Sequence, residues 1–545
     1  MKLSNPIVTV GKCLLITACI AGIHSLAAQT SLHSVQVRTA NGVLEGVVNA
    51  DNQVRTFKGV PFAAPPVGAL RWREPQPVAA WTGVRKATDF GARCMQGMIY
   101  GDMIFHDSGP SEDCLYLNVW IPEAAVAGKA PEQVRLPVMV WIYGGGFAAG
   151  GTSEPRQDGG NLSKKGVIVV SMNYRLGIFG FFTHAGLTAE SPHHASGNYG
   201  LLDQLAALRW VHENIQAFGG DPGNVTIFGE SAGSFSVSAL VASPLAKGLF
   251  QRAIGESGAC FSLTRPMKTR ASAEQAGVKF AETAFGTSSL EALRAKSAQE
   301  ILDAALKVPR ENFTPIVDGY FLPDDCSTLY AQGRQSHVPL LAGWNKDESD
   351  YASYFTNDPP TLENYLIRAR SWFGTNAEAF LKAYPAATDA EAKAAAGEFA
   401  RDRFIVYATW KWLESHLQTG GSPVYRYRFD QNLPLAPDAP PETKPAAHHA
   451  SEIEFVFQVL SSKPLPWRAE HRKTSELMAS YWSNFAKTGD PNGPGLPHWP
   501  KYGVQGAYAV MHLDGDHPGA APDPRRAHYE LVDELRAAGV FRRPE

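Results

Sequence analysis

Residues 224–242 read NVTIFGESAGSFSVSALVA and predict a buried strand, a sharp turn and a helix in direct succession. The apolar, β-branched residues before Gly229 are typical of a strand in a parallel sheet, and the residues after Ser231 favour a helix. The turn matches the pattern G-x-S-x-G, in which small neighbours permit a strained serine backbone and lift the hydroxyl above the sheet edge. We therefore predict that Ser231 is a nucleophile; a glycine-rich helix cap is the alternative.

A similar segment, GESGA at residues 255–259, also follows a predicted strand. It lacks the last glycine of the pattern, and a cysteine-containing loop follows it in place of a helix. Ser257 is therefore predicted to support the site and not to act as its nucleophile.

Strands and helices alternate through the rest of the chain. Further strands are predicted at 136–142, 166–173, 251–255, 338–343 and 423–429, and helices at 201–215, 271–283 and 398–416. This alternation is typical of an α/β fold with a large, mostly parallel central sheet flanked by helices. Because no fixed-period repeat and no long linker interrupt it, residues 29–545 are interpreted as one domain with helical insertions.

A run of three glycines, residues 144–146, follows the predicted strand at 136–142. Glycines at a strand end leave backbone N–H groups bare, so Gly145, Gly146 and Ala232 are predicted to form a three-donor oxyanion hole. An ordinary glycine turn or a phosphate loop is the alternative, but the G-x-x-x-x-G-K-[ST] pattern of a phosphate loop does not follow.

A nucleophilic serine needs a histidine base and a carboxylate that orients it. In α/β hydrolases the chain order is serine, acid, histidine. Asp347 and Glu348 directly follow the predicted strand at 338–343, and His448 and His449 lie in a later loop. Spacing alone leaves both choices open.

The composition excludes several other classes of protein. The chain has 545 residues, 44% of them hydrophobic, which is too much apolar mass for a disordered protein. Lys and Arg number 50 and Asp and Glu 53, for a net charge of −3, so nucleic-acid binding has no electrostatic support. Only the N-terminus contains a long apolar run, which excludes a protein with several membrane spans.

Residues 1–28 are predicted to be a secretory signal peptide. Lys2 and Lys12 precede the 11-residue apolar run at 13–23, and small residues at Ser25 and Ala27 fit a cleavage site. The run is too short to span a bilayer, so a secreted or periplasmic protein without a membrane span is expected. An N-terminal anchor helix is the alternative.

Four of the six cysteines remain after the signal peptide is removed. In an oxidising compartment an even number indicates disulfides. Cys94 and Cys114 are close in sequence and are predicted to pair, which leaves Cys260 with Cys326. Free buried thiols are the alternative.

The sequence resembles the type-B carboxylesterases of the cholinesterase and para-nitrobenzyl esterase family. The resemblance extends over nearly all of the chain after the signal peptide. It is carried by the motifs at 57–63, 65–68, 112–119, 173–175, 197–200, 218–233, 345–348, 449–453 and 488–492.

The resemblance implies which residues form the site. It assigns the acid to Glu348 and the base to His449, leaves Asp347 and His448 as neighbours, and supports the Cys94–Cys114 pair. Glu230 and Glu452 are expected to support the site together with Ser257 without reacting.

The predicted activity is hydrolysis of small to medium apolar or aromatic carboxylic esters through an acyl-enzyme. It needs an ester and water, and no metal or organic cofactor; the histidine pairs at 193–194 and 448–449 lack metal-site spacing. One alternative is a catalytically silent binding or adhesion module, although such relatives lose the nucleophile that is present here. The other is a thioesterase or peptidase with the same triad.

The loop at 95–113 is predicted either to line one wall of an apolar gorge or to pack beneath itself. Its apolar candidates are Met95, Met98, Tyr100, Met103, Ile104 and Phe105. The cholinesterases carry a choline-stacking Trp in this loop, and its absence here makes a choline ester a poor candidate.

Overall fold

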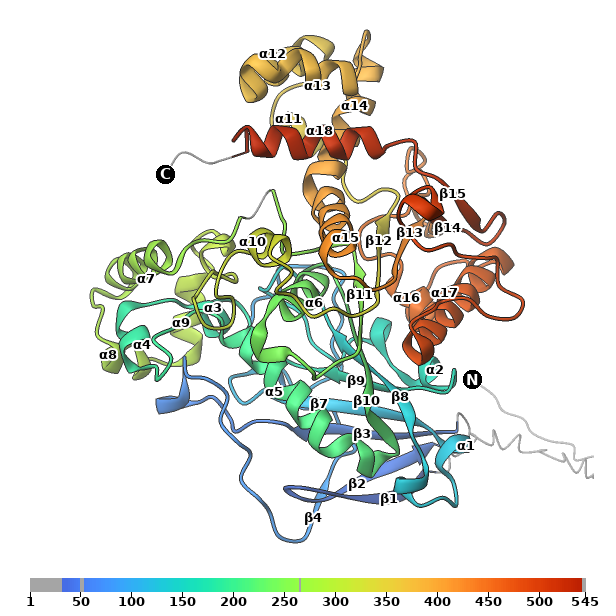
Figure 1. Cartoon of the computed structure of the whole chain (residues 1–545). Helices are drawn as coiled ribbons and strands as arrows, with labels where there is room; N and C mark the ends of the chain where they lie inside the picture. Colours follow the sequence, from blue (N-terminus) through green and yellow to red (C-terminus); the bar gives the residue numbers. More distant parts are fainter. Residues whose placement is uncertain (1–31, 50–52, 264–265, 542–545) are drawn as a thin grey trace, which may run out of the picture.

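The computed structural model describes residues 32–49, 53–263 and 266–541. The predicted signal peptide at 1–28 lies outside these residues. Figure 1 shows a long twisted sheet through the centre of the molecule, with helices on both sides and a helical group at one end.

Twelve strands form one continuous path of hydrogen-bonded neighbours, and β4 (Val84–Lys86) adds to it beside β2. In spatial order the path is β1 (Leu32–Thr39), β2 (Gly42–Asn49), β3 (Val54–Pro61), β7 (Tyr116–Pro122), β9 (Ile168–Met172), β8 (Leu136–Ile142), β10 (Gly220–Glu230), β11 (Arg252–Glu256), β12 (Leu340–Asn345), β13 (Val424–Phe429), β14 (Ala509–Leu513) and β15 (Gly519–Pro522). A separate small sheet pairs β5 (Arg93–Cys94) with β6 (Pro110–Ser111).

The centre of the sheet, from β9 to β14, is parallel, and antiparallel strands lie at its two edges. The central strands are apolar runs because helices cover both of their faces; all residues of β9 and β12 are buried. The predicted α/β fold is confirmed, and the structure has the arrangement of an α/β hydrolase.

Among the described residues, ten α-helices lie between strands β7 and β12 along the chain. They are α1 (Glu123–Val126), α2 (Gly160–Ser163), α3 (Gly177–Phe181), α4 (Ala185–Glu190), α5 (Tyr199–Asn214), α6 (Ala232–Ala242), α7 (Arg270–Phe285), α8 (Leu290–Arg294), α9 (Ala298–Ala305) and α10 (Cys326–Ala331). Helix α6 packs against β10 and β11, while α17 (Ala469–Thr488) packs against β8 and β10 from the other side (Figure 1).

A helical group forms a second, smaller hydrophobic core away from the sheet (Figure 1). It consists of α11 (Ala352–Phe355), α12 (Leu362–Phe373), α13 (Ala377–Ala383), α14 (Asp389–Arg401) and α18 (Arg526–Ala537). Stacked aromatic side chains, such as Phe373 on Phe380, fill it. Helices α11 to α14 are inserted between β12 and β13, whereas α18 follows the last strand; the sequence predicted helical insertions but not their location.

The helix predicted at 398–416 is interrupted. Helix α14 ends at Arg401, a π-helical turn η8 (Asp402–Val406) follows, and α15 (Tyr407–Thr419) continues the chain. The apolar periodicity of an unbroken α-helix and of one with a π-helical turn is similar, so the pattern did not reveal the extra residue of the π turn. The remaining helix, α16 (Ile453–Val456), precedes α17.

Two disulfides close loops, Cys94 with Cys114 and Cys260 with Cys326. All four cysteines are buried. Among the described residues, none of the helices is both long and apolar enough to cross a membrane.

We predict that replacing both Cys94 and Cys114 with Ala lowers the free energy of unfolding by about 3 kcal/mol. The disulfide between them, 20 residues apart in sequence, then no longer restricts the conformations of the unfolded chain. Equilibrium unfolding in urea measures the change. The matched variant lacking Cys260 and Cys326, which are 66 residues apart, should lose about 4 kcal/mol. Unchanged stability in both variants would contradict the loop-entropy argument.

Candidate active site

Ser231 occupies a sharp turn between β10 and α6. Its backbone φ is 55° and ψ is −117°, a conformation that costs a non-glycine residue free energy. The glycines on either side are needed because the chain is crowded there. A Cβ atom on Gly233 would lie 1.9 Å from the carbonyl oxygen of Ile142, and one on Gly229 would lie 2.6 Å from the same oxygen.

The glycine run after β8 lies beside this turn. Gly145 and Gly146 have φ values of 101° and 65°, which glycine adopts without strain. Ala232 is the first residue of α6, so its N–H has no partner within the helix. All three residues line the cavity that contains Ser231.

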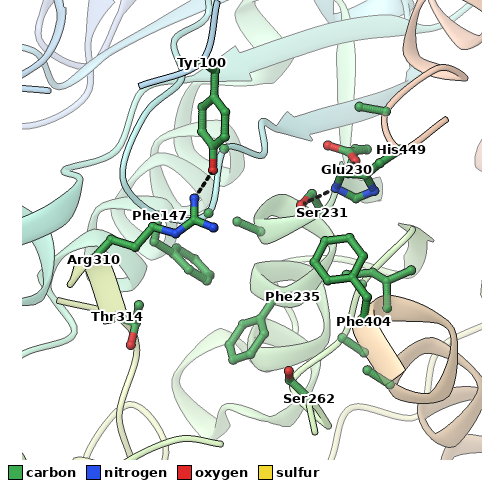
Figure 2. Close-up of a pocket in the computed structure, with 18 of the residues that line it drawn as sticks. Tyr100, Phe147, Glu230, Ser231, Phe235, Ser262, Arg310, Thr314, Phe404 and His449 are labelled. Carbon is green, nitrogen blue, oxygen red and sulfur yellow. Dashed lines mark hydrogen bonds and ion pairs between the residues drawn. The ribbon is translucent and has the colours of Figure 1, made fainter. Parts of the chain in front are cut away.

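The structure brings His449 between Ser231 and Glu348. The Nε2 atom of His449 lies 2.9 Å from the Oγ of Ser231, and the Nδ1 atom of His449 lies 2.6 Å from the Oε2 of Glu348. The other carboxylate oxygen of Glu348 accepts from the Asn345 backbone N–H at 2.7 Å. Figure 2 shows His449 and Ser231 joined at one end of the pocket.

The neighbouring residues that spacing left as alternatives have other contacts. Asp347 accepts a hydrogen bond at 3.0 Å from the backbone N–H of Ala447 and forms a β-bridge with His448. These contacts hold the loop that carries His449 against the end of β12.

Ser257 lies next to Glu348 and not next to His449. Its hydroxyl donates to Glu348 Oε1 at 2.5 Å, and its own φ of 55° repeats the conformation of Ser231 one strand away. It is fully buried, whereas Ser231 opens onto the cavity.

The residues of the site lie close together because each follows a strand of the parallel part of the sheet. Gly145 follows β8, Ser231 follows β10, Ser257 follows β11 and Glu348 follows β12, while His449 arrives on the long loop after β13. The carboxyl ends of parallel strands meet at one edge of a sheet, where ligands bind in α/β proteins.

Three more carboxyl groups lie buried around the histidine. Glu230 Oε1 is 3.3 Å from His449 Nε2, Glu256 accepts from the Trp482 indole at 2.7 Å, and Glu452 accepts from the side chain of Asn345. Burial raises the pKa of each of the three, and their mutual repulsion raises the pKa of Glu256 and Glu452 further. Each therefore has an increased tendency to carry a proton.

The charge of the neighbouring carboxylates changes the pKa of His449. Burial lowers the pKa of His449, but the carboxylates of Glu230 and Glu348 raise it by more, so its pKa lies above the ordinary value. Glu230 and His449 thus compete for a proton within hydrogen-bonding distance of the Ser231 hydroxyl.

The cavity in front of Ser231 has a volume of about 280 Å³. Its apolar wall consists of Met103, Phe147, Phe235, Met267, Phe404 and Ile405. Phe404, on the π-helical turn η8, packs edge-on against the His449 ring with the centroids 5.2 Å apart.

The loop between Cys94 and Cys114 supplies fewer apolar side chains to the cavity wall than its composition made possible. Tyr100, Asp102 and Met103 line the cavity, whereas Met98 and Ile104 are exposed by 68% and 59%. Met95 is buried elsewhere in the core. The prediction of a cavity wall therefore holds for Tyr100 and Met103, and the alternative, packing in the interior, holds for Met95.

Several lining residues were not found by sequence analysis, because nothing in their local pattern marks them. Phe235 and Phe404 read as ordinary helix residues, and Arg310 and Thr314 lie in an irregular segment. Among the described residues, no group of three or more His, Cys, Asp or Glu side chains could hold a metal ion.

A serine, a histidine and a glutamate at the carboxyl ends of parallel strands, beside a glycine-rich turn, are the arrangement of an α/β hydrolase. Residues 33–531 match the family model described as the carboxylesterase family. The chain belongs to this family and is a carboxylic ester hydrolase.

Curated relatives and solved structures agree with that assignment. The chain is 37% identical to the fumonisin B1 esterase of Sphingopyxis macrogoltabida, over 88% of this chain and 87% of the relative. It is 38% identical to the para-nitrobenzyl esterase of Bacillus subtilis (strain 168), over 86% and 92% of the two chains. A solved thermophilic PNB esterase superposes with a TM-score of 0.76 at 34% identity, covering 91% of this chain and 99% of that one.

We predict that Glu230→Gln shifts the acid limb of the pH–rate profile to lower pH. The substitution removes a carboxylate that raises the pKa of His449, and a histidine acting as a base must be neutral, so activity persists further into acid. Because the neighbouring carboxylates raise the pKa of His449 to about 10, kcat/KM is measured from about pH 5 to 11 to give the midpoint.

Glu256→Gln is the matched control, since it removes a buried carboxyl that does not contact His449. A midpoint that stays in place or rises in Glu230→Gln would show that Glu230 does not set the pKa of the base.

Proposed function

We propose that the protein hydrolyses carboxylic esters through an acyl-enzyme formed on Ser231. The observation that carries this proposal is the continuous hydrogen-bonded contact from Ser231 through His449 to Glu348, opening onto a cavity. Nucleophile, base and orienting acid in this order are what acyl transfer needs.

In the proposed reaction, His449 Nε2 takes the hydroxyl proton as Ser231 Oγ attacks the ester carbonyl. Glu348 holds the imidazole by its Nδ1–H and stabilises the positive charge that develops on the ring. His449 then gives the proton to the departing alcohol, which leaves the acyl group bonded to Ser231.

Water repeats the sequence on the acyl-enzyme. His449 takes a proton from water, the hydroxide bonds to the acyl carbon, and the Oγ of Ser231 leaves with the proton returned to it. In both steps the carbonyl oxygen becomes negative, and the N–H groups of Gly145, Gly146 and Ala232 are proposed to bind it.

The substrates are proposed to be small to medium esters with apolar or aromatic groups. The support is the size of the cavity, about 280 Å³, and its wall of Phe and Met side chains. Flexible Met side chains accommodate groups of different shape.

The protein is further proposed to be exported as a single domain, residues 29–545, after loss of the signal peptide. Two disulfides support an oxidising, secreted or periplasmic location. The family match over residues 33–531 supports one domain.

We predict that Ser231→Ala lowers kcat/KM for para-nitrophenyl esters by at least about 10⁴-fold, because it removes the hydroxyl that lies 2.9 Å from His449 Nε2. Ser257→Ala is the matched control: it removes one hydrogen bond to Glu348 and lowers the rate by about tenfold. Melting curves verify that both variants fold. Near-normal activity of Ser231→Ala would overturn the assignment of the nucleophile.

We predict that matched oxygen ester, thioester and anilide substrates with the same acyl group are turned over in the order ester, thioester, anilide. The reaction needs only a leaving group that His449 can protonate, and an amide nitrogen is the poorest of the three. Relative kcat/KM values measure the order. Preferential turnover of the thioester or anilide would identify the protein as a thioesterase or peptidase.

A further inference from the structure

We propose that Arg310 binds a carboxylate on the substrate, remote from the ester that is cleaved, so that the preferred substrates are monoanionic esters. This inference rests on the proposed function and specifies its substrate class. Arg310 lies on the short 3₁₀ turn η6 (Arg310–Asn312) and lines the same cavity as Ser231 and His449.

The guanidinium of Arg310 is held in place at the cavity wall. Its Nη1 donates to the hydroxyl of Tyr100, and the guanidinium carbon lies 5.9 Å from the centre of the Tyr100 ring. Figure 2 shows the group projecting into the pocket between Tyr100 and Phe147, on the side facing Ser231. An arginine fixed by a neutral partner retains its charge for a ligand.

The carboxylate nearest to Arg310 compensates that charge only weakly. Glu311 approaches through Nε at 3.7 Å, longer than a hydrogen bond, and the two side chains are 42% and 37% exposed. The hydrogen bond to Tyr100 uses Nη1, which leaves the Nη2 edge available for a two-pronged contact with a carboxylate.

The other arginine of the cavity, Arg156, differs in this respect. It is 12% exposed, with Nε 2.8 Å from Glu154 and Nη1 3.3 Å from Asp102. Two carboxylates therefore already compensate Arg156, whereas the hydrogen bond of Arg310 goes to the neutral hydroxyl of Tyr100, and its ion-pair distance, to Glu311, is 3.7 Å.

The position of Arg310 in the cavity determines where on the substrate the proposed anionic group lies and how much negative charge it carries. In Figure 2 Ser231 lies between the Arg310 side of the pocket and the Phe404 side, so a substrate that reaches both places its anion away from the reacting carbonyl. One guanidinium neutralises one negative charge, and Glu311, 3.7 Å from the Nε of Arg310, repels a second, which favours a carboxylate over a dianionic phosphate.

The test compares two pairs of substrates in the full-length enzyme. For the acyl side, para-nitrophenyl hemiglutarate is compared with para-nitrophenyl pentanoate; for the alcohol side, para-carboxyphenyl butanoate is compared with phenyl butanoate. The readout is the ratio of kcat/KM for the anionic ester to that for its neutral partner.

In Arg310→Gln this ratio should fall by about tenfold or more for at least one pair. Arg310→Lys retains the positive charge but not the two-pronged guanidinium geometry, so its ratio should lie between those of the wild type and Arg310→Gln. Arg334→Gln removes an exposed arginine outside the cavity and is the matched control for net charge, so it should retain the wild-type ratio.

Each other outcome has a definite meaning. An unchanged or increased ratio in Arg310→Gln for both pairs would overturn the proposed carboxylate site, and so would wild-type enzyme that hydrolyses the neutral esters but neither anionic one. Wild-type enzyme that is folded and hydrolyses no ester of either kind would overturn the proposed function itself.

Discussion

The turn between β10 and α6 holds Ser231 in a strained backbone conformation, and the arrangement of the site is built around that turn. A φ of 55° in a non-glycine residue costs on the order of 1–3 kcal/mol and persists only where the surroundings impose it. Here the register does so, because Gly229 pairs with Ile142 on β8 and with Gly255 on β11. The absence of a Cβ on Gly229 and Gly233 lets α6 begin directly against the sheet.

The second organising feature is an excess of buried carboxyl groups around a single imidazole. Glu230, Glu348 and Glu452 all raise the pKa of His449, while burial and repulsion favour protonation of Glu230 and Glu452 themselves. The proton is therefore shared within the group. For the proposed reaction, this arrangement stabilises the imidazolium that forms when Ser231 attacks, and it raises the pH at which the base becomes free.

The positions of the central strands along the chain could be predicted well from the sequence because their signals are local, whereas their order in the sheet was not predicted. The strand at 136–142 and the helix that follows Ser231 are runs whose composition and period decide their conformation. The π-helical turn at η8 could not be predicted, since the apolar pattern from Asp389 to Thr419 is compatible with one unbroken helix. The placement of the 95–113 loop was ambiguous for a similar reason: its apolar residues fit either a cavity wall or a core.

Local sequence was enough to predict the strand–turn–helix at Ser231, the glycine run after β8 and a serine followed along the chain by candidate carboxylates and histidines, since each depends on adjacent residues or on strand ends. Between Asp347 and Glu348, and between His448 and His449, only a family resemblance could choose. Tertiary structure alone decided the walls of the cavity, which join Met103, Arg310 and Phe404 from three distant segments. The physical reason is that a cavity wall is a contact across space, and contacts between distant segments leave no period or spacing in the chain.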